Sequence, residues 1–179
     1  MIRQIKNIIA ITVFLICIGL INFAGQNIDI EVRGINAFTF ILIIAVLLQI
    51  IFFIPSFLLK TEKYYDLVGS LTYVTTVSLA YFAVENKTMI DSIIYFYVMV
   101  WASRLGIYLF RRVRNDGKDV RFEKAKRHFF WFLQYWMGQA LWVTLTACAA
   151  IIAILSPEDD TLPVLAIFGM ALWLSGFTI

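Results

Sequence analysis

Residues 35–59 read INAFTFILIIAVLLQIIFFIPSFLL, and this stretch contains no charged side chain. A helix needs roughly 20 consecutive, mainly apolar residues to cross the hydrocarbon core of a membrane. A helix buried inside a soluble domain is normally shorter and keeps a polar face. The stretch therefore predicts a transmembrane helix. Pro55 is expected to kink or end it, because proline lacks a backbone N–H.

Similar apolar stretches follow one another along the chain. The expected spans are residues 7–24, 35–59, 64–84, 89–110, 129–155 and 161–179, with Pro163 in the first turn of the last span, where proline is tolerated. The composition agrees, with 61% hydrophobic and 15% charged residues, against roughly half and a quarter in soluble domains. We expect an all-α fold, a polytopic membrane bundle of about six transmembrane helices that forms one domain over residues 1–179.

The distribution of basic residues predicts the orientation. Twelve of the 15 Lys and Arg residues precede residue 7 or lie in the segments 60–63 and 111–127, whereas the loops on the other side hold only Arg33 and Lys87. Short cytoplasmic loops are enriched in Lys and Arg, so the N-terminus is expected in the cytoplasm. The net charge of +3 is explained by these loops, and the sequence therefore does not favour nucleic-acid binding.

The two cysteines, Cys17 and Cys148, lie in apolar stretches, which argues against a disulfide framework. His128 is the single histidine, so a multi-histidine metal site is excluded. The apolar run after Lys6 is longer than the core of a signal peptide. We interpret it as a retained helix of a protein in the lipid bilayer, in a bacterial cytoplasmic (inner) membrane.

Charged residues within membrane spans are costly and tend to be functional. Asp66 lies near the start of the third span and Arg104 near the cytoplasmic end of the fourth, so both are expected at a similar depth. Adjacent antiparallel helices would bring them together. A plain ion pair that holds two helices together, or an arginine that extends to the interface, remains an equal alternative.

The residues around Arg104 sharpen the functional interpretation. Tyr97, Trp101, Arg104 and Tyr108 follow helical spacing and share one face. An arginine beside aromatic rings is suited to hold a phosphate or a flat ring. An aromatic belt at the membrane interface would also explain Tyr108.

Asp66 shares a helix face with Gly69, Ser70 and Tyr73. A carboxyl group with tyrosines nearby can place a proton donor over a cavity. The alternative, which we weigh somewhat higher, is a face of small and polar residues that packs against another helix.

Two patterns resemble a known family, namely W-x-x-R-L at residues 101–105 and D-x-R-F at residues 119–122, on either side of a short basic loop. The segment 65–70 and Gln139 match as well. Over residues 64–179 the chain resembles uncharacterised bacterial membrane proteins related to the steroid 5-alpha-reductases. The resemblance implies an integral-membrane oxidoreductase, open to the cytosol, that uses NADPH to reduce an activated C=C bond of a hydrophobic, lipid-like substrate.

The resemblance also implies site residues. In that family an acidic residue and, one helix later, an aromatic residue face the enone of the substrate, and these positions match Asp66 and Trp101. The steroid enzymes have a tyrosine at the aromatic position, and indole is a poor proton donor. The donor role would therefore move to Tyr65 or Tyr97.

Four further residues would lie near the phosphates of the cofactor by the same resemblance, namely Arg104, Tyr108, Arg114 and Arg121. The family continues beyond this point with an acid-bearing cofactor motif, further helices and an R-H-P-N-Y-type segment. We therefore expect the sequence to represent the amino-terminal part of a longer domain that holds the substrate side of the site, and expect this polypeptide alone not to turn over.

Two other functions remain open. A membrane methyltransferase of the isoprenylcysteine type has related architecture and would bind S-adenosylmethionine instead of NADPH. A non-catalytic helical membrane protein would use Asp66 and Arg104 only to hold helices together, and would tolerate their joint replacement by apolar residues.

Overall fold

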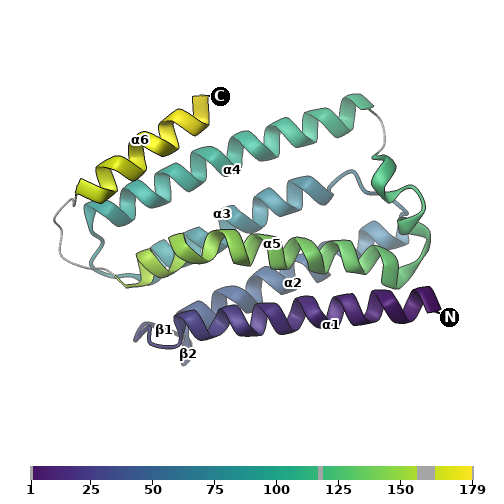
Figure 1. Cartoon of the computed structure of the whole chain (residues 1–179), viewed down its shortest axis with the longest axis horizontal. Coiled ribbons are helices and arrows are strands. Elements are labelled where there is room, and N and C mark those ends of the chain that lie inside the picture. Colours follow the sequence, from purple (N-terminus) through teal and green to yellow (C-terminus); the bar gives the residue numbers. More distant parts are fainter. Residues whose placement is uncertain (1, 117–118, 157–163, 179) are drawn as a thin grey trace.

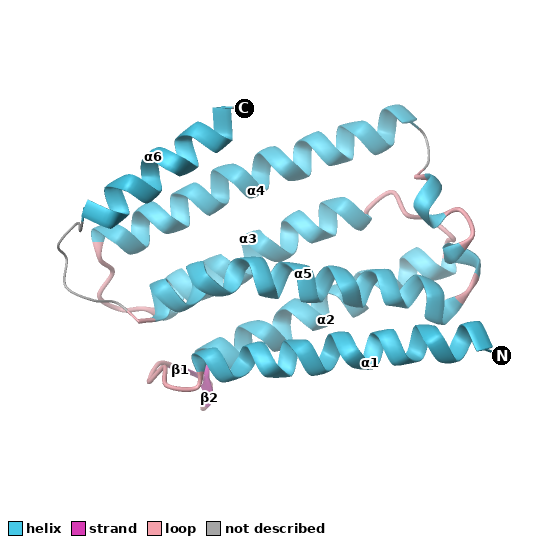
Figure 2. Cartoon of the chain, in the orientation of Figure 1, coloured by secondary structure: helices cyan, strands magenta, loops and turns pink. Residues whose placement is uncertain are grey.

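Six α-helices make up most of the described chain, which in this computed structural model comprises residues 2–116, 119–156 and 164–178. They are α1 (Ile2–Asn22), α2 (Ala37–Leu58), α3 (Tyr65–Ala83), α4 (Met89–Asp116), α5 (Phe129–Leu155) and α6 (Val164–Thr178). The helices lie side by side along the long axis of the molecule (Figure 1). Short loops join them mainly at the two ends of the bundle (Figure 2).

Four of these helices are long and apolar enough to cross a membrane: α1, α2, α4 and α5. The spans predicted at these four places are confirmed to that extent. The helix α6 is apolar but shorter, and α3 carries several polar residues that face the interior of the bundle. For α3 and α6 the membrane crossing stays a prediction.

Two expected helix ends differ from the structure. The helix α4 continues to Asp116, so the expectation that residues 111–116 belong to a loop was wrong. The helix α2 runs on past Pro55 to Leu58, and the chain turns at Lys60, which has a φ of 51°. Pro163 lies outside the described residues.

A short hairpin between α1 and α2 was not predicted. The strands β1 (Glu31–Val32) and β2 (Ile35–Asn36) pair antiparallel through a two-residue turn. Arg33 and Gly34 both have positive φ values, 55° and 77°, which is the geometry that a two-residue hairpin turn requires. The hairpin lies at the end of the bundle opposite the N-terminus (Figure 1).

The helix α3 lies at the centre and packs against α2, α4 and α5. Two of its buried hydroxyl groups are satisfied locally, because Thr72 and Thr76 donate to backbone carbonyls one turn earlier. Gln49 of α2 donates to Thr72 across the interface at 2.8 Å. Interhelical hydrogen bonds of this kind hold membrane helices together without requiring an apolar core.

Small residues bring α3 close to its neighbours. Ser70 donates to the carbonyl of Ala102 on α4 at 2.5 Å, and a Cβ added at Gly106 would lie 2.5 Å from the Ser70 hydroxyl oxygen. A Cβ added at Gly69 would lie 2.4 Å from the amide nitrogen of Gln139 on α5. The packing interpretation of the face that carries Gly69 and Ser70 therefore has direct support.

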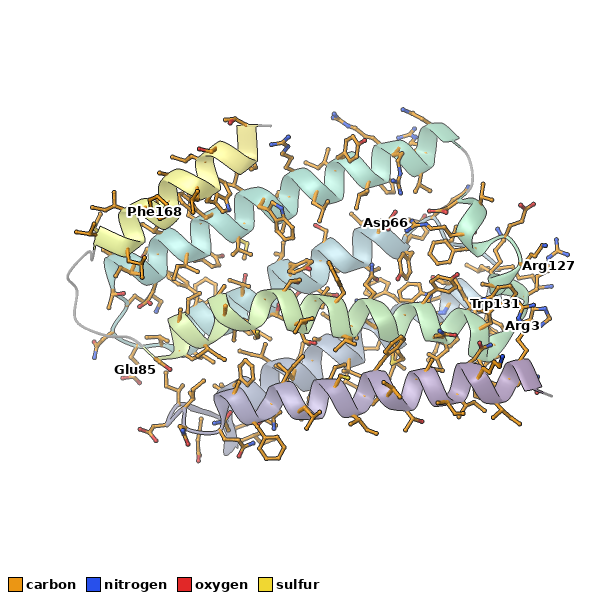
Figure 3. All side chains as sticks on the ribbon, in the orientation of Figure 1. Arg3, Asp66, Glu85, Arg127, Trp131 and Phe168 are labelled. Atoms are coloured by element: carbon orange, nitrogen blue, oxygen red, sulfur yellow. The ribbon has the colours of Figure 1, made fainter. Side chains whose placement is uncertain are left out.

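The loops that carry most of the basic residues meet at one end of the bundle. The start of α1, the turn between α2 and α3, and the segment between α4 and α5 all lie at that end (Figure 1). Figure 3 shows Arg3 and Arg127 there and Glu85 at the opposite end. We refer to the end of the bundle that carries Arg3 and Arg127 as the basic end.

Candidate functional site: a charged cluster and a cationic cavity

Asp66 lies in the first turn of α3, at the basic end, and pairs with two arginines. Its Oδ2 atom is 3.3 Å from Nη2 of Arg112 and 3.7 Å from Nη2 of Arg121. Arg104 is not its partner, although similar depth had suggested that the two would meet. Among the described residues, no hydrogen bond is found to Oδ1 of Asp66.

Asp119 forms a charged cluster together with Asp66, Arg112 and Arg121. It also fixes the segment between α4 and α5. Its carboxylate accepts from both the backbone N–H and the guanidinium of Arg121, with Nε 2.9 Å from Oδ2. The hydrogen bond from the Arg121 side chain lowers the pKa of Asp119, and the same contact raises the pKa of Arg121. Both side chains are therefore charged at neutral pH.

Phe122 anchors this segment in the bundle. It ends the short 3-10 helix η2 (Val120–Phe122) and is 1% exposed. Its ring contacts Tyr65 and Tyr135, with centroids 4.7 Å and 4.9 Å away. Because Phe122 is held in an aromatic cluster, its neighbour Arg121 is held over Asp66. The D-x-R-F segment thus attaches the loop to α3 through the contacts of Arg121 with Asp66 and of Phe122 with Tyr65.

Glu62 and Lys126 form a further ion pair of the charged cluster. Glu62, in the turn between α2 and α3, is 4% exposed and accepts from Lys126 at 2.6 Å. Its other oxygen accepts from the backbone N–H of Asp119 at 3.2 Å. A buried carboxylate needs such partners, and these bring the loop onto the start of α3.

Tyr65 is adjacent to Asp66 in sequence but points into the bundle. Its hydroxyl donates to the carbonyl of Tyr135 at 2.9 Å, and its ring lies edge-on to Trp136, with centroids 5.2 Å apart. The hydroxyl proton is therefore engaged in a hydrogen bond with the backbone, which favours a packing role for Tyr65 over that of a proton donor.

Arg104 lies in a different place, facing α6. Its guanidinium is 4.5 Å from the ring centroid of Phe177 and donates to the carbonyl of the same residue. Together with Trp101 and Tyr108 it lines a cavity of about 310 Å³ between α4 and α6. Among the described residues, Arg104 forms no ion pair with a carboxylate, and its guanidinium contacts Phe177.

The other predicted residues lie along the same helix. Tyr97 stacks on Trp173 of α6 with centroids 4.3 Å apart, and lines a neighbouring apolar cavity. Arg114 lies towards the basic end and shares a cavity of about 230 Å³ with Lys63 and Tyr64. Ten residues of helix, roughly 15 Å, separate Arg104 from Arg114.

The structure thus divides the predicted site into two groups. Asp66 and Arg121 meet in the charged cluster, whereas Trp101, Arg104 and Tyr108 meet in the cavity beside α6. Trp101 contacts Tyr73 edge-on at 4.9 Å, about two helical turns from Asp66 along α3. Asp66 and Trp101, which the resemblance places on one substrate, do not converge in this arrangement.

Four members of the charged cluster were not predicted as site residues, namely Glu62, Arg112, Asp119 and Lys126. Asp119 was noted only as the first residue of the D-x-R-F pattern, and no role in the site was assigned to it. Arg112 was assigned to a loop, and the extension of α4 by one and a half turns brings it beside Asp66. No sequence signal marks Glu62, whose burial depends on the fold.

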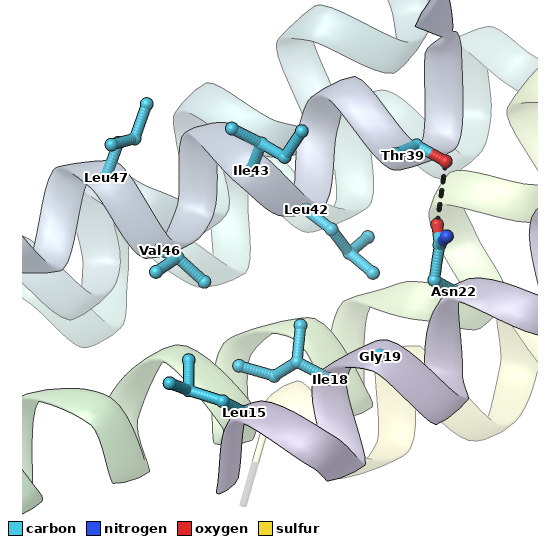
Figure 4. A pocket seen from close by; sticks show the side chains of 9 residues that line it. All are labelled: Leu15, Ile18, Gly19, Asn22, Thr39, Leu42, Ile43, Val46 and Leu47. Atoms are coloured by element: carbon cyan, nitrogen blue, oxygen red, sulfur yellow. Dashed lines mark hydrogen bonds between the residues drawn. The ribbon is translucent and has the colours of Figure 1, made fainter. Parts of the chain in front are cut away.

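An apolar groove between α1 and α2 is chemically different from both sites (Figure 4). It has a volume of about 330 Å³ and is lined mostly by aliphatic side chains such as Leu15 and Val46. Its polar residues, Asn22 and Thr39, hydrogen-bond to each other at 2.8 Å. The groove contains no titratable side chain, and it is suited to a hydrocarbon chain.

Long apolar helices around a small polar interior define an integral membrane protein of the α-helical class. The sequence identifies the family within this class of protein. Residues 52–179 match the model of the family described as protein of unknown function (DUF1295). The chain belongs to this family, which is the steroid 5-alpha-reductase-like family. No curated protein and no solved structure matches the chain.

Proposed function

We propose that the protein is a steroid-5-alpha-reductase-like membrane oxidoreductase, which transfers a hydride from NADPH to an activated C=C bond of a lipid-like substrate. The observation that carries the proposal is the cavity between α4 and α6. It combines Arg104, which forms no ion pair with a carboxylate of the described residues, with the aromatic residues Trp101 and Tyr108. A guanidinium beside aromatic rings is suited to a phosphate and to a flat ring, and a nicotinamide dinucleotide contains both.

The cationic residues of α4 extend this site towards the basic end. Arg114 and Lys63 line a second cavity, and the span of helix from Arg104 to Arg114 suits an extended ligand with more than one phosphate. In this proposal Asp66, held by Arg112 and Arg121 through one oxygen, has its other oxygen available to a polar group of the substrate or cofactor. Tyr97 and Trp101 line the apolar approach.

Binding measurements on the purified protein test the proposal. We expect NADPH to bind more tightly than NADH or S-adenosylmethionine. Arg104→Gln should weaken NADPH binding at least tenfold, since a charge-assisted hydrogen bond to a phosphate is lost. Arg111→Gln is the matched control, because Arg111 is an exposed arginine on the same helix outside the cavity.

Three outcomes would contradict it. Preferential binding of S-adenosylmethionine would favour a methyltransferase. Equal effects of the Arg104 and Arg111 substitutions would indicate non-specific attraction by the basic surface. Absence of binding by any nucleotide, together with unchanged folding of a variant in which Asp66 and Arg104 are both replaced by apolar residues, would favour a non-catalytic protein.

A further inference from the structure

The basic end contains a polar cavity that belongs to neither group of site residues. It lies between the start of α1 and the start of α5 and has a volume of about 450 Å³. Arg3, Gln4 and Asn7 line it from α1, and Arg127, His128 and Trp131 line it from the other side. Figure 3 shows Arg3, Arg127 and Trp131 close together at this end of the bundle.

The two arginines of this cavity have no acidic partner in the part of the chain that the structure describes. Neither Arg3 nor Arg127 forms an ion pair with a carboxylate of the described residues, and none of the lining residues is acidic. By contrast, Arg112, Arg121 and Lys126 in the charged cluster each pair with an acid. The cavity therefore gathers positive charge that no acidic residue among its described lining balances.

Trp131 holds one of the arginines in place. The guanidinium carbon of Arg3 lies 3.5 Å from the centroid of the Trp131 ring, a cation–π contact. The His128 ring stacks near the same indole, with centroids 6.0 Å apart. Stacking leaves the edge of the guanidinium, with its N–H groups, available to an acceptor.

Two helix ends add to the positive potential. The helices α1 and α5 both begin beside the cavity, at Ile2 and Phe129. The first N–H groups of a helix lack intrahelical acceptors and favour a negative charge nearby. His128, the residue before α5, provides no side-chain cap for them.

The position of the cavity points to the source of the anion. Both α1 and α5 are long and apolar enough to cross a membrane, so their starts would lie at the depth of the lipid headgroups. Phe129 and Phe130, beside the cavity, are exposed apolar residues suited to contact with acyl chains. Basic pockets between membrane helices bind anionic headgroups.

We propose that this cavity binds the phosphate of an anionic phospholipid, with Arg3 and Arg127 as the residues that contact it. The site is separate from the cavity around Arg104, so the proposal does not depend on the reductase function. Bound lipid would join α1 to the start of α5 at the membrane surface.

Native mass spectrometry of the detergent-purified protein tests this site. The protein is titrated in parallel with short-chain phosphatidylglycerol, short-chain phosphatidylcholine and inorganic phosphate. Arg3→Gln combined with Arg127→Gln removes the two charges. Lys60→Gln combined with Arg111→Gln is the matched control, because it removes two exposed charges of the same end outside the cavity.

We expect phosphatidylglycerol to bind in preference to the other two probes. A basic residue near a membrane surface contributes about 1 kcal/mol to the attraction of anionic lipid. The Arg3 and Arg127 double variant should therefore bind about 30-fold more weakly, and the control variant should bind like the unmodified protein. Trp131→Leu should give a smaller loss, since it removes the stacking and keeps both charges.

Other results overturn the proposal. Equal binding of phosphatidylcholine would show that the phosphate charge is not recognised. Binding of inorganic phosphate as tight as that of the lipid would assign the cavity to a soluble phosphate compound. An equal loss in the control variant would show attraction by the whole basic end. If the double variant fails to fold, the comparison of the three probes on the unmodified protein still decides.

Discussion

Single residues at the basic end join segments that lie far apart in the sequence. The carboxylate of Asp119 accepts hydrogen bonds from the backbone N–H and the side chain of Arg121. The backbone N–H of Asp119 donates to the carboxylate of Glu62, which precedes α3. Asp66 receives Arg112 from α4 and Arg121 from the loop. The charges of this cluster thus fix the loop by electrostatics as well as by burial of Phe122.

The lowered pKa of Asp119 makes this arrangement dependent on pH. A carboxyl group whose pKa is lower in the folded than in the unfolded state adds stability above its ordinary pKa of 3.8. That stability is lost as the pH falls through the lowered folded-state value. We expect the thermal unfolding midpoint to fall as the pH is lowered through this acidic range.

Asp119→Asn tests the assignment. The variant should be less stable at neutral pH and should show a flatter pH profile, because asparagine does not titrate and cannot pair with Arg121 as an anion. Asp29→Asn, which removes an exposed acid from the loop before the hairpin, should leave the profile unchanged. A profile of Asp119→Asn that is as steep as that of the unmodified protein contradicts the assignment.

At the scale of elements, the helix starts depend on specific side chains. Asn36 caps α2, since its Oδ1 accepts from the N–H of Thr39 at 3.1 Å. Its Nδ2 donates to the carbonyls of Gly25 and Ile28, at 3.1 Å and 2.8 Å. One side chain therefore both begins α2 and ties down the segment after α1. Asp91, buried at the start of α4, similarly accepts from the N–H of Thr88.

Replacing Asn36 should destabilise the protein measurably. Loss of a helix cap costs about 1 kcal/mol, and each of two carbonyls that lose their donor adds about 1 kcal/mol. We expect Asn36→Ala to lower the free energy of unfolding in detergent by about 3 kcal/mol, and Asn36→Ser, which keeps an acceptor for the cap, to lower it less. Asn27→Ala, at an exposed position of the same segment, serves as the control and should have little effect. Equal losses in the Asn36→Ala and Asn36→Ser variants would exclude the capping contribution.

The two ends of the molecule differ in their content of basic residues. The starts of α1 and α3 and the segment between α4 and α5 form the basic end, and the hairpin and the α3–α4 connection form the other (Figure 1). This arrangement agrees with the predicted clustering of basic residues on one side of a membrane. The cytoplasmic location of that side, in a bacterial inner membrane, stays a prediction from the sequence.

Labelling of single cysteines determines the orientation and tests whether α3 crosses. In a background without Cys17 and Cys148, Lys60→Cys and Glu85→Cys place one thiol at each end of α3. We expect an impermeant maleimide to label Glu85→Cys in intact cells, and Lys60→Cys only after permeabilisation. The reverse pattern would invert the orientation. Labelling of both from outside would show that α3 does not cross the membrane.

Much of the helical architecture was predictable from local pattern. The predicted spans agree within three residues with α2, α3, α5 and α6, because a lipid environment demands satisfied backbone groups and a continuous apolar surface. The helix α1 begins at Ile2, five residues before the expected start. The extension of α4 to Asp116 was missed, since its last turns are charged and resemble a loop. The hairpin was missed because its strands have only two residues each.

The sequence by itself determined the class of the protein and the end of the bundle at which its charges gather, since hydropathy and loop charge act locally along the chain. Only the tertiary structure decided which charges meet. Asp66 pairs with Arg112 and Arg121, and Arg104 turns to α6. The physical reason is that side-chain direction on a helix is set by the register of packing. Ser70 against Gly106 fixes how α3 lies on α4, and no local pattern encodes that register.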